Sequence, residues 1–158
     1  MNRTRQGFTL VELLIVIVVI GILSAMMMMS SNEAVTTAKA NNIAANLRSI
    51  KTAALAYYVD NMEEANGLTK IDDNVRKAIF GYLDGKADIS DSDRKNYTFG
   101  LNDGRWYVEC NVSGAVNGVG VSDVQKKLAK RAKSNGLLNS ENTSYYTKQT
   151  DKIRLYVR

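Results

Sequence analysis

The feature that most constrains this chain is an apolar run near its start, within MNRTRQGFTLVELLIVIVVIGILSAMMMM. Residues 13–29 carry no charge, and with residues 8–11 in front the run can cross about 30 Å of hydrocarbon as a helix. Residues 16–20 are β-branched and would favour a strand in water, but in lipid a lone segment must satisfy its own backbone and becomes helical. Arg3 and Arg5 precede the run, so the positive-inside rule predicts a cytoplasmic N-terminus.

Two simpler interpretations of the run compete with a functional one. A cleaved secretory signal would have a shorter apolar core, and Ser24-Ala25-Met26 is a poor cleavage site. A plain signal anchor accounts for the length but not for Glu12, because a carboxylate costs about 2.5–3.5 kcal/mol at the centre of a spanning helix. Glu12 lies close to the end of the run, so a residue that snorkels to the membrane surface stays open as an alternative.

Glu12 belongs to a longer motif. Residues 6–13, QGFTLVEL, follow a short basic leader and resemble the class III signal of type IV pilins and the related pseudopilins. The resemblance covers roughly residues 1–60. It implies that a prepilin peptidase cuts between Gly7 and Phe8 and that the new Phe8 amine is methylated. It also implies that the apolar segment serves first as a membrane anchor and then as the core of a filament.

The charge chemistry of Glu12 fits this implication. Cleavage would create a positive Phe8 amine in an apolar environment, where the Glu12 carboxylate of a neighbouring subunit can neutralise it. Burying either charge alone has a high desolvation cost, which the other charge offsets when the two are paired. A subunit at the wrong height would leave both charges unpaired. We therefore expect Phe8 and Glu12 to set the subunit register, and Gly7 to let the protease approach the backbone.

Beyond the run, the sequence predicts an α+β protein with a long helical stem. Residues 8–64 contain no proline and can form one helix of roughly 80 Å, which Asn66-Gly67 would end. Three- and four-residue spacing predicts an apolar stripe made of Ala34, Ala38, Ile43, Ala45, Leu47, Ile50, Ala54, Leu55 and Tyr58. The expected parts are a cleaved leader (1–7), a transmembrane and filament-core helix (8–30), an amphipathic half of the stem (31–65) and a globular head (66–158).

A β-hairpin is predicted in the middle of the head, in YTFGLNDGRWYVECNV. Asp103-Gly104 suits a two-residue type I′ turn. This turn pairs Leu101 with Trp106, Phe99 with Val108 and Tyr97 with Cys110, so that the apolar faces of both strands coincide. A one-residue slip would turn every side chain of one strand to the other face. Cys110 is expected to be a small buried hydrophobe rather than a reactive thiol.

The remaining elements of the head follow from helix and strand signals. One face of a short helix is predicted from Ile71, Val75, Ile79 and Leu83, followed by a polar loop over residues 86–95. Ser122 and Gln125 indicate a capping box before a helix that Gly136 closes. Ile153, Leu155 and Val157 alternate with polar residues and predict a third strand. We expect an antiparallel sheet packed over the stripe of the stem.

The amino-acid composition excludes most of the common kinds of catalytic site. There is no histidine, so the usual metal sites and the Ser/His or Cys/His nucleophile pairs are unavailable to the chain. A single cysteine cannot form an internal disulfide. Neither a catalytic residue nor a cofactor is predicted. The formal net charge is +5, of which Arg3 and Arg5 supply two, so charge alone does not indicate a nucleic-acid partner.

Two clusters in the head have a binding interpretation, although a solvated surface is favoured for both. Spaced carboxylates can bind calcium, but those of Asp84, Asp88, Asp91 and Asp93 match no EF-hand spacing. A basic helix face could contact DNA phosphates. It would comprise Lys126, Lys127, Lys130, Arg131 and Lys133.

The leading hypothesis is a structural filament subunit rather than an enzyme. Its expected partners are further copies of itself, the membrane, prepilin peptidase, the filament assembly platform and minor pilins. The sequence leaves open a major pseudopilin of a type II secretion system, and a minor or DNA-uptake pilin that acts as a DNA-binding module. The expected location is the bacterial cytoplasmic membrane for a single-pass precursor with its N-terminus inside, then an extracellular or periplasmic filament.

Overall fold

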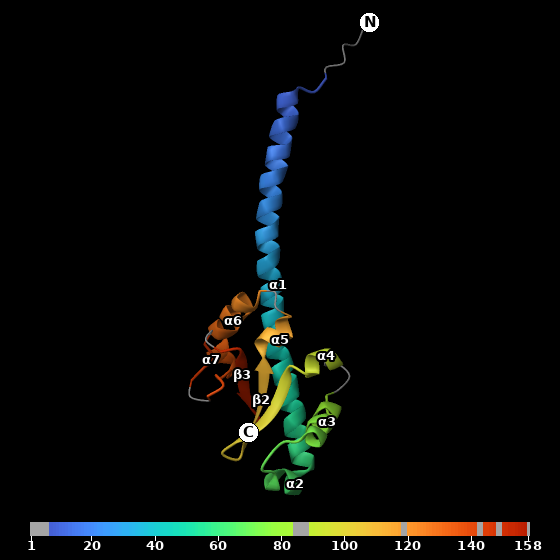
Figure 1. The fold of residues 1–158 in the computed structure, drawn as a ribbon, viewed down its shortest axis with the longest axis vertical. Helices are drawn as coiled ribbons and strands as arrows, with labels where there is room; N and C mark the ends of the chain where they lie inside the picture. The colour runs from blue at the N-terminus through green and yellow to red at the C-terminus, as the bar shows by residue number, and fades with distance from the viewer. Residues whose placement is uncertain (1–6, 84–88, 118–119, 142–143, 148–149, 158) are drawn as a thin grey trace. The chain divides into compact units, whose positions relative to one another are not determined.

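The computed structural model describes residues 7–83, 89–117, 120–141, 144–147 and 150–157 (Figure 1). In chain order the elements are α1 (Leu10–Asp60), α2 (Met62–Gly67), α3 (Asp73–Gly81), α4 (Asp91–Arg94), β1 (Tyr97–Asn102), β2 (Arg105–Asn111), α5 (Val112–Val116), α6 (Val121–Lys130), α7 (Ala132–Asn135) and β3 (Lys152–Tyr156). The chain divides into two compact units, Met1–Val35 and Thr36–Arg158. The predicted α+β class, with a long N-terminal helix and a small antiparallel sheet, is confirmed.

The first unit contains the apolar part of α1. Every large apolar side chain from Leu10 to Leu23 is at least 48% exposed, so the helix is apolar on all sides and has no core of its own. The β-branched residues 16–20 are helical, as predicted. Among the described residues, α1 is the helix that is long and apolar enough to cross a membrane.

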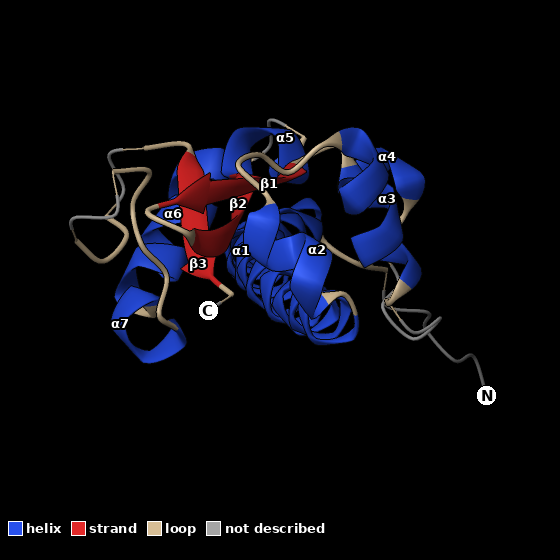
Figure 2. Ribbon diagram, turned by 90° about the horizontal axis from the view of Figure 1, so that it is seen from below, coloured by secondary structure: helices blue, strands red, loops and turns tan. Residues whose placement is uncertain are grey.

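The second unit is built around the C-terminal half of α1. Its core joins Ile43, Leu47 and Ile50 of α1 to Val108 of β2 and Ile153 of β3. Burial of each such side chain stabilises the fold by about 1.5–3 kcal/mol. The sheet covers α1, while α6 and α7 lie to one side of it and α3 and α4 to the other (Figure 2). The expected packing of an antiparallel sheet on the stem is therefore observed within this unit.

The buried face of α1 agrees only in part with the predicted stripe. The predicted residues that are buried are Ile43, Leu47, Ile50, Ala54 and Tyr58. The predicted residues that are exposed instead are Ala34, Ala38, Ala45 and Leu55. The core also contains Ala40, Ala53 and Tyr57, which the stripe left out. Alanine is small enough to lie on either face of a helix, so the spacing of these alanines did not fix which face packs on the sheet.

The end of the long helix was also predicted wrongly. α1 ends at Asp60 rather than near residue 64, and Asn66 and Gly67 lie within α2 instead of breaking the stem. The interruption is at Asn61, whose side-chain Nδ2 donates a 2.9 Å hydrogen bond to the Tyr57 carbonyl. Such local bonds from asparagine compete with the helical ladder and favour helix ends.

The hairpin prediction is confirmed in turn and register. β1 and β2 pair Leu101 with Trp106, Phe99 with Val108 and Tyr97 with Cys110. Asp103 and Gly104 have φ values of 50° and 71°, the positive values that a type I′ turn requires at both central positions. Cys110 is fully buried, and this burial raises the pKa of its thiol to about 12, so it stays neutral.

β3 pairs antiparallel with β2, and Ile153, Leu155 and Val157 are buried, so the third strand is confirmed. Gly136 ends α7 in the left-handed conformation, as predicted. The capping box before α6 is wrong: the helix begins at Val121 after Gly120. The buried Gln125 side chain instead donates a 2.6 Å hydrogen bond to Asp151 Oδ1, because a buried amide requires a polar partner.

Three smaller differences concern the segments around the hairpin. α3 begins at Asp73, because the Asp72 carboxylate accepts hydrogen bonds from the amides of Asn74 and Val75 and caps the helix. The predicted face residues Ile71 and Leu83 therefore lie outside the helix. The predicted polar loop contains α4 and the buried residue Ile89, and the short helix α5 after β2 was not predicted.

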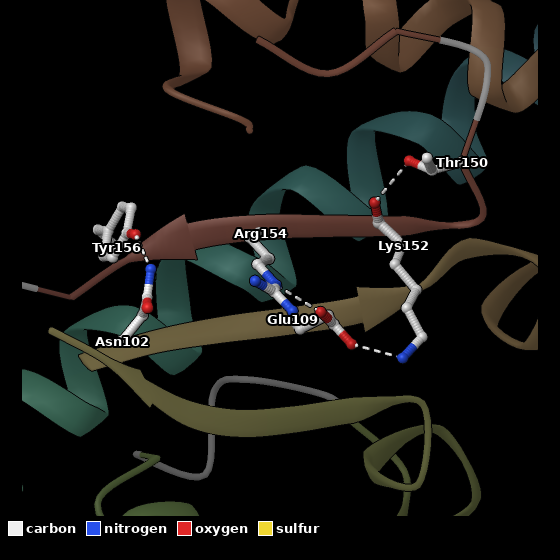
Figure 3. A network of polar contacts seen from close by, with 6 residues as sticks. All are labelled: Asn102, Glu109, Thr150, Lys152, Arg154 and Tyr156. Carbon is white, nitrogen blue, oxygen red and sulfur yellow. Dashed lines mark hydrogen bonds and ion pairs between the residues drawn. The ribbon is translucent and has the colours of Figure 1, made fainter. Parts of the chain in front are cut away.

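The sheet face opposite the core carries a buried carboxylate. Glu109 is 6% exposed, and its two oxygens lie 2.5 Å from Arg154 Nε and 3.0 Å from Lys152 Nζ (Figure 3). Arg154 also lies over the Tyr107 ring, 4.4 Å from its centroid. Desolvation by itself would raise the pKa of Glu109, but the hydrogen bonds and charges of Arg154 and Lys152 outweigh it and leave the pKa lowered.

This network predicts a pH-dependent stability. Because the folded pKa of Glu109 is lowered, its contribution is present above the ordinary glutamate pKa of about 4.3 and is lost as the pH falls through the folded value. We expect urea midpoints of the detergent-solubilised chain, followed by Trp106 fluorescence, to fall between pH 5 and pH 3. Glu109→Gln should lower the midpoint at pH 7 and flatten this dependence, whereas Glu141→Gln, at an exposed site, should do neither. Equal pH profiles for wild type and Glu109→Gln would contradict the assignment.

Candidate functional site

The start of α1 is organised by a reciprocal pair of residues, Thr9 and Glu12. Glu12 Oε2 accepts hydrogen bonds from the Thr9 amide at 2.8 Å and from Thr9 Oγ1 at 2.7 Å. In return, Thr9 Oγ1 accepts from the Glu12 amide at 3.2 Å. This is the capping-box arrangement, and it supplies partners to backbone amides that have none within the helix.

The sequence analysis missed this role of Glu12 and did not single out Thr9. The signal was present, because Thr-x-x-Glu before an apolar run is the signature of a capping box. The contacts also change the cost of placing Glu12 in an apolar segment. Two donors of its own chain already bind the carboxylate, which offsets part of its desolvation before any partner arrives.

The predicted cleavage bond lies just before this cap. Gly7 and Phe8 are outside the helix, which begins at Leu10. Phe8 is 84% exposed, and among the described residues no atom beyond the chain neighbours lies within 4 Å of the position that a Gly7 Cβ would occupy. An exposed, non-helical peptide is the form in which proteases bind their substrates. The pairing of the Phe8 amine with Glu12 of another copy concerns an assembled form and stays a prediction.

The basic residues of the head lie on two short helices rather than on one. Arg131 separates α6 from α7 and donates a hydrogen bond to Asn41 Oδ1 of α1. Lys126 is paired with Asp123 at 2.9 Å. Lys130 and Lys133 are exposed, whereas Lys127 is half-buried. Part of the predicted DNA-binding charge is therefore already engaged within the chain.

The acidic residues proposed for calcium are only partly described. Asp84 and Asp88 lie outside the described residues, and only the backbone of Asp91, at the start of α4, is described. The Asp93 carboxylate accepts a 2.7 Å hydrogen bond from Ser90 Oγ. In the part of the chain that the structure covers, no three His, Cys, Asp or Glu side chains are placed to hold a metal ion.

Comparison with known proteins supports the N-terminal site. A family model described as the prokaryotic N-terminal methylation motif matches residues 2–28. This motif is the class III signal of type IV pilins, so the resemblance of residues 6–13 is confirmed, and the match supports a type IV pilin-like precursor. No curated protein and no solved structure matches the chain.

The DNA-binding alternative can be tested on the exposed lysines of α6 and α7. We expect combined Lys126→Gln, Lys130→Gln and Lys133→Gln changes to leave filament yield nearly unchanged, because exposed charges contribute little to stability. Gel-shift titrations at two salt concentrations should likewise give the wild-type affinity. Weaker DNA binding with a flatter salt dependence would show that these lysines contact phosphates.

Proposed function

We propose that the chain is a structural subunit of a type IV pilus-superfamily filament and not an enzyme. The observation that carries this proposal is the methylation motif at residues 2–28 together with α1, a helix that exposes apolar side chains on every side from Leu10 to Leu23. A surface of this kind is unstable in water and requires a lipid or protein environment. The membrane provides it for the precursor, and the α1 helices of neighbouring copies provide it in the filament.

Processing links the two environments. Prepilin peptidase removes residues 1–7 on the cytoplasmic side, and the Phe8 amine is then methylated. The precursor is held in the bacterial cytoplasmic membrane with its N-terminus inside, and the assembly platform and minor pilins move it into the filament. The exposed Gly7–Phe8 bond ahead of a capped helix supports this order, because cleavage leaves the cap of Thr9 and Glu12 in place.

Glu12 then has two tasks that make different chemical demands. Capping requires an acceptor oxygen within reach of Thr9, which an amide also supplies. Neutralising the Phe8 amine of a neighbouring copy requires a negative charge. A substitution that keeps the oxygen and removes the charge therefore separates the two tasks.

A major pseudopilin of a type II secretion system would use the same anchor, cleavage and cap. A minor or DNA-uptake pilin would use them too. These alternatives differ in where the polymer lies and in how many copies it contains. Electron microscopy of material sheared from the cell surface, with antibody labelling of this chain, separates them: a long labelled filament identifies a major pilus subunit.

Processing is tested by mass spectrometry of the chain purified from cells with active prepilin peptidase. We expect the mature chain to begin at Phe8 with a methylated amine, because residues 2–28 carry the methylation motif. Gly7→Trp should block cleavage, since a large side chain replaces one that leaves the backbone open. A mature N-terminus beyond Ala25, or an intact leader in such cells, would contradict the proposal.

The charge of Glu12 is tested with three substitutions in otherwise native chains. Glu12→Ala should insert in the membrane at least as well as wild type, because a costly carboxylate has left the apolar segment. Its yield in sheared filaments should fall steeply, since an incoming Phe8 amine buried without its partner costs about 3–5 kcal/mol. Glu12→Asp should be intermediate, because it keeps the charge on a shorter side chain.

Glu12→Gln is the decisive control, because glutamine retains the capping oxygen and lacks the charge. We expect Glu12→Gln to insert normally and to assemble as poorly as Glu12→Ala. Thr9→Val should do the opposite, with a weaker helix start and retained assembly. Wild-type assembly of Glu12→Gln would reduce Glu12 to a capping residue and return the plain signal anchor to consideration.

A further inference from the structure

A basic cleft lies between α3 and α4 in the second unit. It has a volume of about 520 Å³, and its lining includes Arg76 and Lys77 of α3, Arg94 at the end of α4, and Lys95 just after α4. Both arginines lie over the Phe80 ring, with their guanidinium carbons 5.7 and 5.5 Å from its centroid. Among the described residues that line the cleft, Asp73 is the one with a negative charge and four are cationic, so this part of the cleft favours an anionic ligand.

Arg76 has an incomplete set of hydrogen-bond partners among the described residues. Its Nη2 donates a 2.9 Å hydrogen bond to the Arg94 carbonyl, which fixes the guanidinium in the cleft. Its Nη1 lies 3.9 Å from the carboxylate of Asp73, which is 89% exposed, so this pair is long and open to water. Its Nε is buried and has no hydrogen-bond partner among the described residues. Within the described residues, the guanidinium of Arg76 therefore keeps hydrogen-bonding capacity that its own chain does not use.

The two lysines extend the positive charge to the rim. Lys77 and Lys95 are exposed, and within the described residues neither forms an ion pair. Cations at the rim of a cleft attract an anionic partner, and an arginine inside it supplies directed hydrogen bonds to a carboxylate. The cleft therefore has the chemistry of a carboxylate-binding site.

The same unit presents carboxylates with the complementary arrangement. The junction of α1 and α2 carries Asp60, Glu63 and Glu64, all exposed. Neither Glu63 nor Glu64 forms an ion pair within the described part of the chain. α2 is held in place, because Ala65 is buried and Tyr58 Oη donates a hydrogen bond to Asn66 Oδ1. Glu63 and Glu64 are thus presented on a short helix that is held in place, and they form no ion pair with the described cleft residues of their own chain.

We propose that the α3–α4 cleft of one copy receives the acidic α1–α2 junction of a second copy, with Glu63 and Glu64 as the contacting carboxylates. The inference rests on the proposed function, because a filament holds copies side by side and raises their effective concentration. Cleft and junction are different surfaces of one unit, so the contact is head-to-tail. A head-to-tail contact propagates along an open assembly instead of closing into a two-fold dimer.

The test uses charge reversals that leave Arg76 in place, because Arg76 packs on Phe80 and supports the Arg94 carbonyl. Lys77→Glu with Lys95→Glu should lower the yield of sheared filaments several-fold, because the rim then repels Glu63 and Glu64. Glu63→Lys with Glu64→Lys should lower it similarly. All four changes in one chain should restore most of the yield, because the charges are complementary again. Lys130→Glu with Lys133→Glu, at two exposed sites on α6 and α7, is the matched control and should assemble like wild type.

A second measurement locates the contact directly. Filaments grown from a mixture of isotopically light and heavy chains are treated with a reagent that couples amines to carboxylates at zero length. We expect light–heavy peptides that join Lys77 or Lys95 to Glu63 or Glu64. Such peptides cannot arise within one chain.

The outcomes separate this inference from the function on which it rests. Wild-type filaments without these cross-links, together with failed restoration by the four changes, would overturn the contact and leave the filament role intact. A second outcome would also overturn the contact: the Lys77→Glu, Lys95→Glu chain assembles normally but no longer binds inorganic phosphate as wild type does. The cleft would then be a site for small anions. If the wild-type chain forms no filament, the proposed function fails and this inference fails with it.

Discussion

The apolar surface of α1 is the constraint on which the rest of the molecule depends. In the second unit the helix buries Ile43, Leu47 and Ile50 against the sheet, and this contact holds the head together. In the first unit no described element covers the same helix, and most of its leucine, isoleucine and valine side chains are half or more exposed. Hydrophobic burial is non-directional and proportional to area, so either lipid or other copies of the helix can satisfy this surface. One continuous helix thus forms part of the core of a folded unit and also exposes an apolar surface that requires lipid or other copies of the helix.

Within that surface, Glu12 is the charged exception, and its contacts show how the chain tolerates it. The Thr9 amide and hydroxyl bind the carboxylate locally, so an isolated chain does not carry a bare charge into an apolar segment. The Thr9 amide and hydroxyl are neutral donors, so they leave the negative charge of Glu12 without an opposite charge. In the proposed filament this remaining charge is what distinguishes one subunit height from another. The cap lowers the cost of placing Glu12 in an apolar segment of the precursor. In the proposed filament, the negative charge of Glu12 selects the position of the next subunit.

How far the sequence predicted the structure depended on how local the controlling interaction was. The hairpin was predicted correctly because Asp103-Gly104 and the alternating side chains specify turn and register within sixteen residues. The buried face of α1 was only partly predicted, because alanines fit two faces equally and the sheet decides between them. Gln125 was assigned to a cap because its tertiary partner, Asp151, lies far along the chain. The basic cleft could not be predicted, since Arg76 and Arg94 meet only after α3 and α4 pack around Phe80.

In the proposed filament, the affinity between subunits and their register come from different residues. Burying α1 among its copies supplies a large driving force, but leucine and isoleucine surfaces slide past one another at little cost. Charged groups add little net affinity after desolvation, yet a mismatch between them is expensive, so they select position and partner. In our proposal, Glu12 supplies such a selection in the apolar segment, and the α3–α4 cleft supplies a second one between heads. A subunit that pairs Glu12 correctly but misplaces the cleft contact, or the reverse, still buries α1 but leaves charges unpaired. Correct placement therefore requires both charge contacts to form.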